Sequence, residues 1–197
     1  MLEKRYLMTI NLIRDARRSS GLSQKGLSQR SGVAASSLSL IENGKRSPTI
    51  ETAEKLLKFT GHTLIAIPTL RETAAVIANR IGEAVTAGRS DLALRHFIQL
   101  NDNLLAEKNE VRYILGTAEP ASTGQKHWDA AIAGVVAYRL REEGFPAPSW
   151  TLKPGRRLRK RWTLNAGRYV VPVDPKNVPA EFLERGVLVD ALTLASI

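Results

Sequence analysis

Four glycines divide the first third of the chain into segments that are too short for anything but small helices. Gly21, Gly32, Gly44 and Gly61 stand 11, 12 and 17 residues apart, with apolar residues at helical spacing between them. Glycine commonly ends a helix because it adopts the left-handed backbone conformation without steric cost. Residues 9–60 are therefore expected to form short helices joined by tight turns, which is a compact all-α unit.

Two of these segments carry the signals of a helix pair. Ser23 stands where an N-cap oxygen is required, so a helix is expected to begin at Gln24, with Leu27 as its contact with the core. Gly32 allows a sharp turn, after which apolar residues repeat along one side of a second helix. These apolar residues are Val33, Leu38 and Ile41. The other sides of that helix carry small residues and are expected to be exposed: Ala34, Ala35, Ser36 and Ser39.

Residues 12–64 closely resemble the helix-turn-helix domains of the Cro/repressor, or XRE, family. The residues that carry the resemblance are Ile13-Arg14-x-x-Arg17, Gly21-Leu22-Ser23-Gln24, Leu27, Gly32-Val33 and Ile41-Glu42-Asn43-Gly44-Lys45-Arg46-Ser47-Pro48. The resemblance implies a mainly α chain whose residues 1–68 form a lambda-repressor-like domain of five helices with a short strand. It also implies a sequence-specific regulator of transcription, a repressor, that binds double-stranded DNA.

Helix-turn-helix domains place the start of their second helix against base edges in the major groove. Here Ser36 and Ser39 can donate or accept hydrogen bonds, while Ala35 and Leu40 can touch a thymine methyl group. Ser37 is included in this base-reading set, although its side chain can turn toward the interior. None of these residues offers a bidentate contact of the kind that arginine makes with guanine.

The resemblance also implies which residues hold the DNA backbone. Ser23 and Gln24 open the first helix of the motif, where family members hold a phosphate and where a helix N-terminus favours an anion. Asn43, Lys45 and Arg46 follow the second helix and would grip phosphates, which sets register rather than sequence preference.

A structural ion pair is implied between Arg17 and Glu42, because the family pairs an arginine of its first helix with the glutamate before the Asn-Gly turn. An arginine fork can meet a carboxylate at two points inside a small domain.

A short strand is predicted at Leu64–Ile67, an apolar run between Gly61 and Pro68. A similar strand pairs across the dimer in HipB-type antitoxins, and the resemblance therefore implies a homodimer. Two recognition helices about 34 to 36 Å apart would then read a palindromic operator.

The charge of the chain favours a polyanionic partner. Its net charge is +10; residues 1–70 contain 11 basic and 5 acidic residues, and residues 71–197 contain 18 and 14. The absence of cysteine excludes disulfides and thiolate metal sites. We expect no signal peptide, and the sequence shows no apolar stretch of about 20 residues. We expect a cytoplasmic protein that needs no metal or cofactor and does not contact a membrane.

Residues 72–197 are expected to form a second, helical or α+β domain for partner binding or oligomerisation. Apolar periodicity predicts four helices, at 72–87, from Ser90 or Asp91 to Leu105, at Val111–Leu115 and at His127–Glu143. Residues 146–197 contain six prolines and short apolar runs, which indicates a small α+β tail. The runs are Tyr169–Val173 and Val187–Val189.

Two further features of this domain leave alternatives open. Six basic residues, Lys153, Arg156, Arg157, Arg159, Lys160 and Arg161, form either a solvated surface, a second nucleic-acid contact or a dock for an acidic partner. The triplet His127-Trp128-Asp129 is best interpreted as a helix start with Trp128 in the core, since no catalytic motif accompanies it. We therefore expect no enzymatic activity.

Residues 124–197 are similar to the C-terminal part of bacterial helix-turn-helix proteins that are encoded beside nucleotidyltransferase-like toxins. The residues that carry this similarity are Trp128-Asp129-Ala130, Pro148-x-Trp150 and the segment 179–190. It implies an antitoxin that binds a cognate toxin and represses its own operon. The alternatives are a phage or plasmid repressor with a ligand-sensing or oligomerisation domain, and an enzyme fused to a DNA-binding module.

Overall fold

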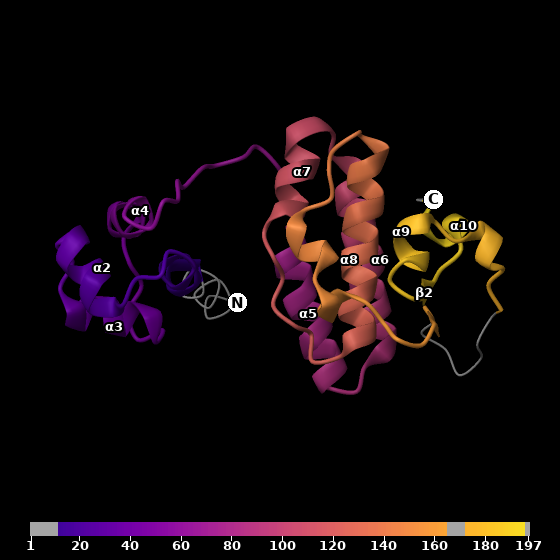
Figure 1. Ribbon diagram of the computed structural model, residues 1–197, viewed down its shortest axis with the longest axis horizontal. Helices are drawn as coiled ribbons and strands as arrows, with labels where there is room; N and C mark the ends of the chain where they lie inside the picture. Colours follow the sequence, from indigo (N-terminus) through magenta and orange to yellow (C-terminus); the bar gives the residue numbers. More distant parts are fainter. Residues whose placement is uncertain (1–11, 165–171, 196–197) are drawn as a thin grey trace. The chain divides into compact units, whose positions relative to one another are not determined.

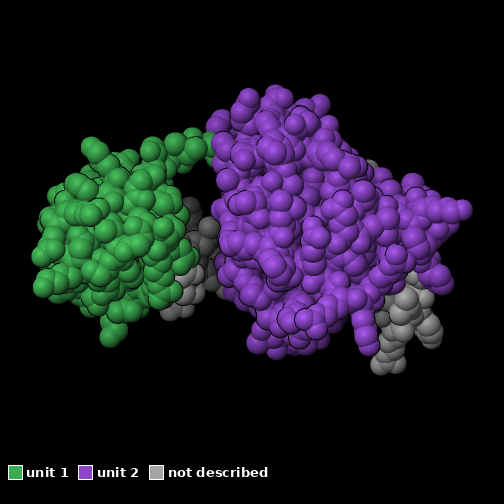
Figure 2. Space-filling view, in the orientation of Figure 1, with its two compact units in different colours: residues 1–67 green, residues 68–197 purple. Residues whose placement is uncertain are grey.

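The computed structural model describes residues 12–164 and 172–195 and is mainly α-helical, as expected. The chain divides into two compact units, Met1–Ile67 and Pro68–Ile197, which are called unit 1 and unit 2 below (Figure 2). Within the described residues, no helix is long and apolar enough to cross a membrane.

Unit 1 consists of short helices. Residues 12–19 are helical, and α2 (Gln24–Ser31), α3 (Ala35–Glu42) and α4 (Ile50–Lys58) follow. The helix that was expected to start at Gln24 does so, because the Ser23 side chain accepts a hydrogen bond from the Gly26 N–H. Four helices lie between residues 12 and 67, where the resemblance implied five for the whole domain; residues 1–11 lie outside the described part.

The core of unit 1 joins all four helices. Its buried residues are Ile13, Leu27, Leu38, Ile41, Ala53 and Leu56, with Leu22 and Val33 packed against them. Gly32 ends α2 at a φ of 67°, in the left-handed region, and so turns the chain into α3. The apolar residues that were expected to face inward from α2 and α3 therefore hold these two helices in one fixed arrangement.

The strand predicted at Leu64–Ile67 is wrong for the single chain. Residues 62–69 contain neither helix nor strand, and the side chains of Leu64 and Ile65 are 41% and 63% exposed. A strand is stabilised only by hydrogen bonds to a neighbouring strand. The described part of unit 1 contains no strand with which these residues could pair, so nothing completes the ladder.

Unit 2 is built around four helices, α5 (Ala74–Thr86), α6 (Ser90–Ala106), α7 (Asn109–Thr117) and α8 (Lys126–Glu142) (Figure 1). All four predicted helices are present. The second of them begins at Ser90, the earlier of the two expected starts, and Arg89 at its N-cap position makes no side-chain capping bond. In α8, buried positions run without a break from Trp128 to Ala137, because this helix contacts its neighbours on every side.

The tail after α8 is a small α+β region, as expected. It contains two single-turn 3-10 helices, η1 (Ser149–Leu152) and η2 (Pro154–Arg156), followed by β1 (Trp162–Thr163) and a third, η3 (Pro175–Asn177). The chain continues with α9 (Ala180–Leu183), β2 (Val187–Leu188) and α10 (Ala191–Leu194).

The two strands of the tail are parallel, with Trp162 opposite Val187 and Thr163 opposite Leu188. The predicted run Val187–Val189 thus contains β2. Of the run at 169–173, residues 169–171 lie outside the described part, and residues 172 and 173 are not in a strand.

Candidate DNA-binding interface

The outer side of α3 is built from small side chains. Ala35 and Ser36 are exposed, Ser37 and Ser39 are partly exposed, and Leu40 is 41% exposed. The opposite side of the helix is anchored by three buried residues, Leu38, Ile41 and Glu42. Small side chains on a helix fixed in this way leave room for close approach of its backbone to another surface.

Two side-chain hydrogen bonds join α3 to the turn that follows it. The guanidinium of Arg46 donates to Ser37 Oγ at 3.3 Å, and the side-chain amide of Asn43 donates to Ser39 Oγ at 3.3 Å. Lys45, between them in sequence, is exposed. The turn therefore joins two of the predicted base-reading serines to two of the predicted phosphate-binding residues, Ser37 to Arg46 and Ser39 to Asn43.

The N-terminus of α2 carries the remaining predicted contacts. Ser23 caps the helix with its Oγ at 3.0 Å from the Gly26 N–H and is itself exposed. The side chain of Gln24 turns inward and donates to Glu42 Oε2 at 2.7 Å. In the free protein, Gln24 therefore links α2 to the end of α3, and its phosphate contact stays a prediction.

The ion pair implied between Arg17 and Glu42 is present and bidentate. Arg17 Nε lies 2.6 Å from Oε1 and Nη2 lies 2.8 Å from Oε2, while Nη1 donates to the Leu22 carbonyl at 2.8 Å. Glu42 is only 1% exposed. Three segments, namely the helix of residues 12–19, the start of α2 and the end of α3, therefore meet at one carboxylate.

The electrostatics of Glu42 follow from this geometry. Burial raises the pKa of the carboxyl group, but hydrogen bonds from Arg17 and Gln24 outweigh it, so that the pKa lies below its ordinary value of 4.5. The same pairing raises the pKa of Arg17. Both groups are charged at neutral pH, and the pair fixes the helix of residues 12–19 relative to α3.

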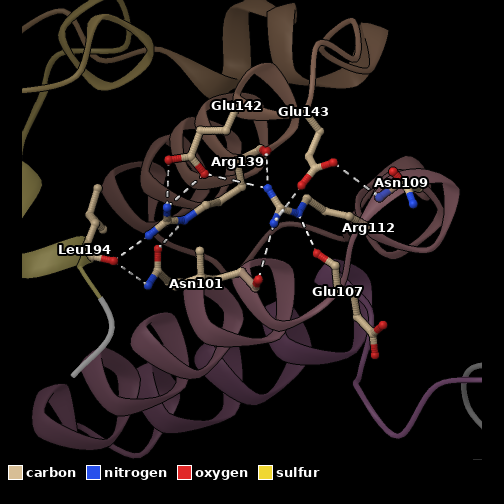
Figure 3. Close-up of polar contacts among 9 residues, drawn as sticks. Asn101, Glu107, Asn109, Arg112, Arg139, Glu142, Glu143 and Leu194 are labelled. Atoms are coloured by element: carbon tan, nitrogen blue, oxygen red, sulfur yellow. Dashed lines mark hydrogen bonds and ion pairs between the residues drawn. The ribbon is translucent and has the colours of Figure 1, made fainter.

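Unit 2 contains a buried polar cluster that sequence reasoning missed (Figure 3). Arg112 donates to the carbonyls of Leu105, Glu107 and Arg139 at 3.2, 2.7 and 3.1 Å. Its guanidinium also lies 3.1 Å from the Glu143 carboxylate. These bonds tie α6, α7 and α8 together.

Arg139 completes the cluster at the other end. It donates to Asn101 Oδ1 at 2.9 Å, to both carboxylate oxygens of Glu142 at 2.9 Å, and to the carbonyl of Leu194. Asn101 donates to the same carbonyl at 3.0 Å. Because each nitrogen of this guanidinium already has a partner, the cluster holds the helices of unit 2 together and is not an open binding site.

The triplet at the start of α8 is also held by structural contacts. Trp128 is buried, and the ring of Trp162 lies 4.6 Å from that of His127 and 5.5 Å from that of Trp128. The Asp129 carboxylate accepts from Ser122 and Thr123. Among the residues that the structure describes, no three His, Asp or Glu side chains gather as metal ligands would.

The comparison with known families agrees with the geometry of unit 1. Residues 13–65 match the model of the helix-turn-helix family HTH_3, a span that covers the described helices of unit 1 and ends before unit 2. No curated protein and no solved structure matches the chain. Residues 13–65 are therefore a helix-turn-helix domain of the Cro/C1 type, with α2 and α3 as its two central helices.

Proposed function

We propose that this protein represses transcription by binding double-stranded DNA through unit 1, with α3 in the major groove. The observation that carries the proposal is that two serines of α3, Ser37 and Ser39, are hydrogen-bonded to Arg46 and Asn43, with Lys45 exposed in the same turn. The family match of residues 13–65 supports it, since such domains dock in this way. The proposal assigns no catalytic step to unit 2.

The chemistry of α3 and of the turn after it divides into two roles. Lys45 and Arg46 provide charge-assisted contacts to phosphates, which supply affinity at low salt and hold the register. Ser36 and Ala35 lie near the start of α3, where side chains reach base edges. Because these side chains are small, the proposed specificity also draws on DNA shape at positions that the protein does not touch.

The test compares two substitutions on DNA from upstream of the protein's own gene. Arg46→Ala removes a phosphate contact, so it is expected to weaken binding to every sequence and to lower the slope of log affinity against log salt by about 0.9. Ser36→Ala removes a base contact, so it is expected to weaken only the specific site, by about 1 kcal/mol. Fluorescence anisotropy titrations at several salt concentrations measure both effects.

Lys58→Ala is the matched control for charge. Lys58 is exposed on the last turn of α4, outside α2, α3 and the turn after them. Its substitution is therefore expected to leave the slope of log affinity against log salt nearly unchanged. The proposal is wrong if wild-type binding does not depend on salt, or if Lys58→Ala and Arg46→Ala weaken binding equally.

A homodimer on a palindromic operator is part of the proposal. It is supported by three exposed large hydrophobic side chains at the end of unit 1: Phe59 at 40%, Leu64 at 41% and Ile65 at 63% exposed. Pairing of two copies along residues 64–67 would cover this apolar surface and supply the missing strand partner. In analytical ultracentrifugation, the wild type is expected to sediment as a dimer and the Leu64→Ser/Ile65→Ser variant as a monomer.

We further propose that unit 2 binds a toxin, which makes the protein an antitoxin. The support is the similarity of residues 124–197 to such proteins. Several residues that carry it, including Trp128, Trp150 and Phe182, are buried, so the similarity concerns the fold of unit 2 rather than a contact surface. Coexpression with the product of the adjacent gene tests the role: the two proteins should copurify, and this protein should relieve growth arrest caused by its neighbour.

A further inference from the structure

Four exposed cations crowd into five residues between η2 and β1. They are Arg157, Arg159, Lys160 and Arg161, and they are called the cationic loop below. Together with Lys153 and Arg156 they make up the six basic residues between positions 153 and 161, which are called the basic run below. Lys153 and Arg156 have partners inside unit 2. Lys153 Nζ lies 2.5 Å from the Glu119 carboxylate, and Arg156 is buried with its guanidinium 3.6 Å from Asp129. Of these six cations, only the four of the cationic loop face solvent without such a partner.

The backbone of the cationic loop is held on both sides. The Leu158 N–H donates to the Arg185 carbonyl at 3.0 Å, and the Trp162 N–H donates to the Gly186 carbonyl at 2.8 Å. Gly186 has a φ of 73°, and a Cβ there would lie 3.1 Å from that of Leu158. The cations thus project from an ordered segment, which lowers the entropy lost when a ligand fixes them.

No carboxylate neutralises this loop. Its four cations form no ion pair within the described residues, and residues 144–173 contain no Asp or Glu in the sequence. The pKa of Arg185 is lowered chiefly by burial; the nearby charge of Glu184 opposes this shift, the positive charge of Arg157 adds to it, and Glu181 opposes it. Like charges that lack a countercharge repel one another, so an external anion stabilises the arrangement.

The positive charge of the second part of the chain is concentrated in the basic run. Residues 71–197 contain 18 basic and 14 acidic residues, and 6 of the basic ones lie between positions 153 and 161. The rest of this part contains 12 basic and 14 acidic residues, so it is slightly acidic. Attraction to a polyanion is therefore local to this run.

We propose that the cationic loop binds the phosphate backbone of double-stranded DNA without reading bases, as a second contact in addition to the helix-turn-helix. Three of its four cations are arginines, whose planar guanidinium groups match phosphate oxygens at two points. The covalent link to a helix-turn-helix domain favours DNA over an acidic protein, because binding by unit 1 raises the local concentration of DNA around unit 2. This inference extends the proposed function of unit 1.

The test uses the full chain and a DNA duplex of random sequence. Arg157→Gln/Arg159→Gln/Lys160→Gln is expected to lower the slope of log affinity against log salt by about 2.7, or about 0.9 for each lost phosphate contact. The affinity ratio of wild type to variant should then fall about 40-fold between about 50 mM and about 200 mM salt. The control, Arg89→Gln/Arg95→Gln/Lys108→Gln, removes three exposed cations elsewhere in unit 2 and should keep the wild-type slope.

The single variants Arg159→Gln and Lys160→Gln, each expected to lower the slope by about 0.9, preserve the test if the triple variant does not fold. An unchanged slope in the loop variants, or equal losses in the control, overturns the proposal. The proposal is also overturned if the loop variants keep the wild-type salt slope on DNA but no longer bind poly-glutamate. That result would assign the cationic loop to an acidic protein partner.

Repeating the titrations with Arg46→Ala separates this inference from the function proposed for unit 1. If Arg46→Ala weakens binding and the loop variant does not, the helix-turn-helix function stands and the cationic loop has no role in DNA binding. If only the loop variant weakens binding, the loop contact stands and the function of unit 1 is overturned. Absence of any DNA binding overturns both.

Discussion

Glu42 accepts hydrogen bonds from Arg17 and Gln24, which lie on different helices, and its pKa lies below its ordinary value of 4.5. Glu42→Gln removes the charge that compensates a largely buried arginine, and is expected to destabilise unit 1 by about 3 kcal/mol. Unfolding of unit 1 can be followed separately, since the three tryptophans all lie in unit 2. The part of the helical circular dichroism signal that belongs to unit 1 should therefore be lost under milder conditions than in the wild type, while the tryptophan fluorescence transition of unit 2 should not shift.

The stability of unit 1 is expected to fall as the pH becomes acidic. Because the folded-state pKa of Glu42 is lowered, the carboxylate stabilises the fold fully above about pH 4.5, and this stabilisation is lost as pH falls through the lower folded-state value. Glu42→Gln should remove this loss of stability on acidification. Glu54→Gln, an exposed carboxylate on α4, is the control and should retain it. Identical pH profiles for wild type and Glu42→Gln would contradict the assignment.

Single residues could be predicted where a local rule governs them. Ser23 caps α2 because the rule involves only the next few residues, and the pairing of Arg17 with Glu42 was implied by the family resemblance. Long-range burial was not predictable: Arg112 and Arg139 look like surface cations in sequence, yet each is 3% exposed. Their partners are mostly backbone carbonyls, which leave no trace in residue types.

At the scale of elements, α8 depends on close contact with α9. Gly134 allows the Phe182 ring to lie against the α8 backbone, and a Cβ at this glycine would lie 2.7 Å from Phe182 Cδ1. Alanine adds about 1 kcal/mol of helix propensity, but overpacking against a fully buried ring costs about 1 to 3 kcal/mol. Gly134→Ala is therefore expected to destabilise unit 2.

Urea unfolding followed by tryptophan fluorescence measures this effect, because Trp128 lies on the same helix. Gly155→Ala is the matched control, since a Cβ at Gly155 has no neighbour within 4 Å. The packing argument is wrong if both variants have the same stability as the wild type.

Helices were more predictable than strands in this chain. The periodicity of residues 72–143 predicts the four helices of unit 2, because a helix satisfies its own backbone hydrogen bonds. The pairing of Trp162 with Val187 joins segments 25 residues apart, which no local pattern reveals. The strand expected at Leu64–Ile67 failed for the related reason that its ladder requires a second chain or segment.

At the scale of the whole molecule, the segment between the two cores is the expected site of first cleavage. Residues 62–73 contain no helix or strand, and Leu70 is fully exposed. Thermolysin, which cleaves before large apolar residues, should cut first before Leu70, which lies outside the proposed dimer contact at residues 64–67, and release a larger fragment that retains its native tryptophan fluorescence. Mass spectrometry of a time course identifies the site.

Leu70→Ser should slow this first cut. Leu152 and Leu192, which are 53% and 81% exposed in unit 2, provide the internal comparison. A first cut at either of them would show that the tail of unit 2 opens more readily than the segment between the cores.

In the buried cluster of Figure 3, the positions that accept hydrogen bonds tolerate sequence change better than the positions that donate them. Arg112 contacts three backbone carbonyls, and Arg139 and Asn101 share the carbonyl of Leu194. Every amino acid supplies a carbonyl, so the residues that accept these bonds can change without loss of the acceptor. The donors have no such freedom. Divergent relatives should therefore retain the two arginines while the sequence of the tail drifts around them.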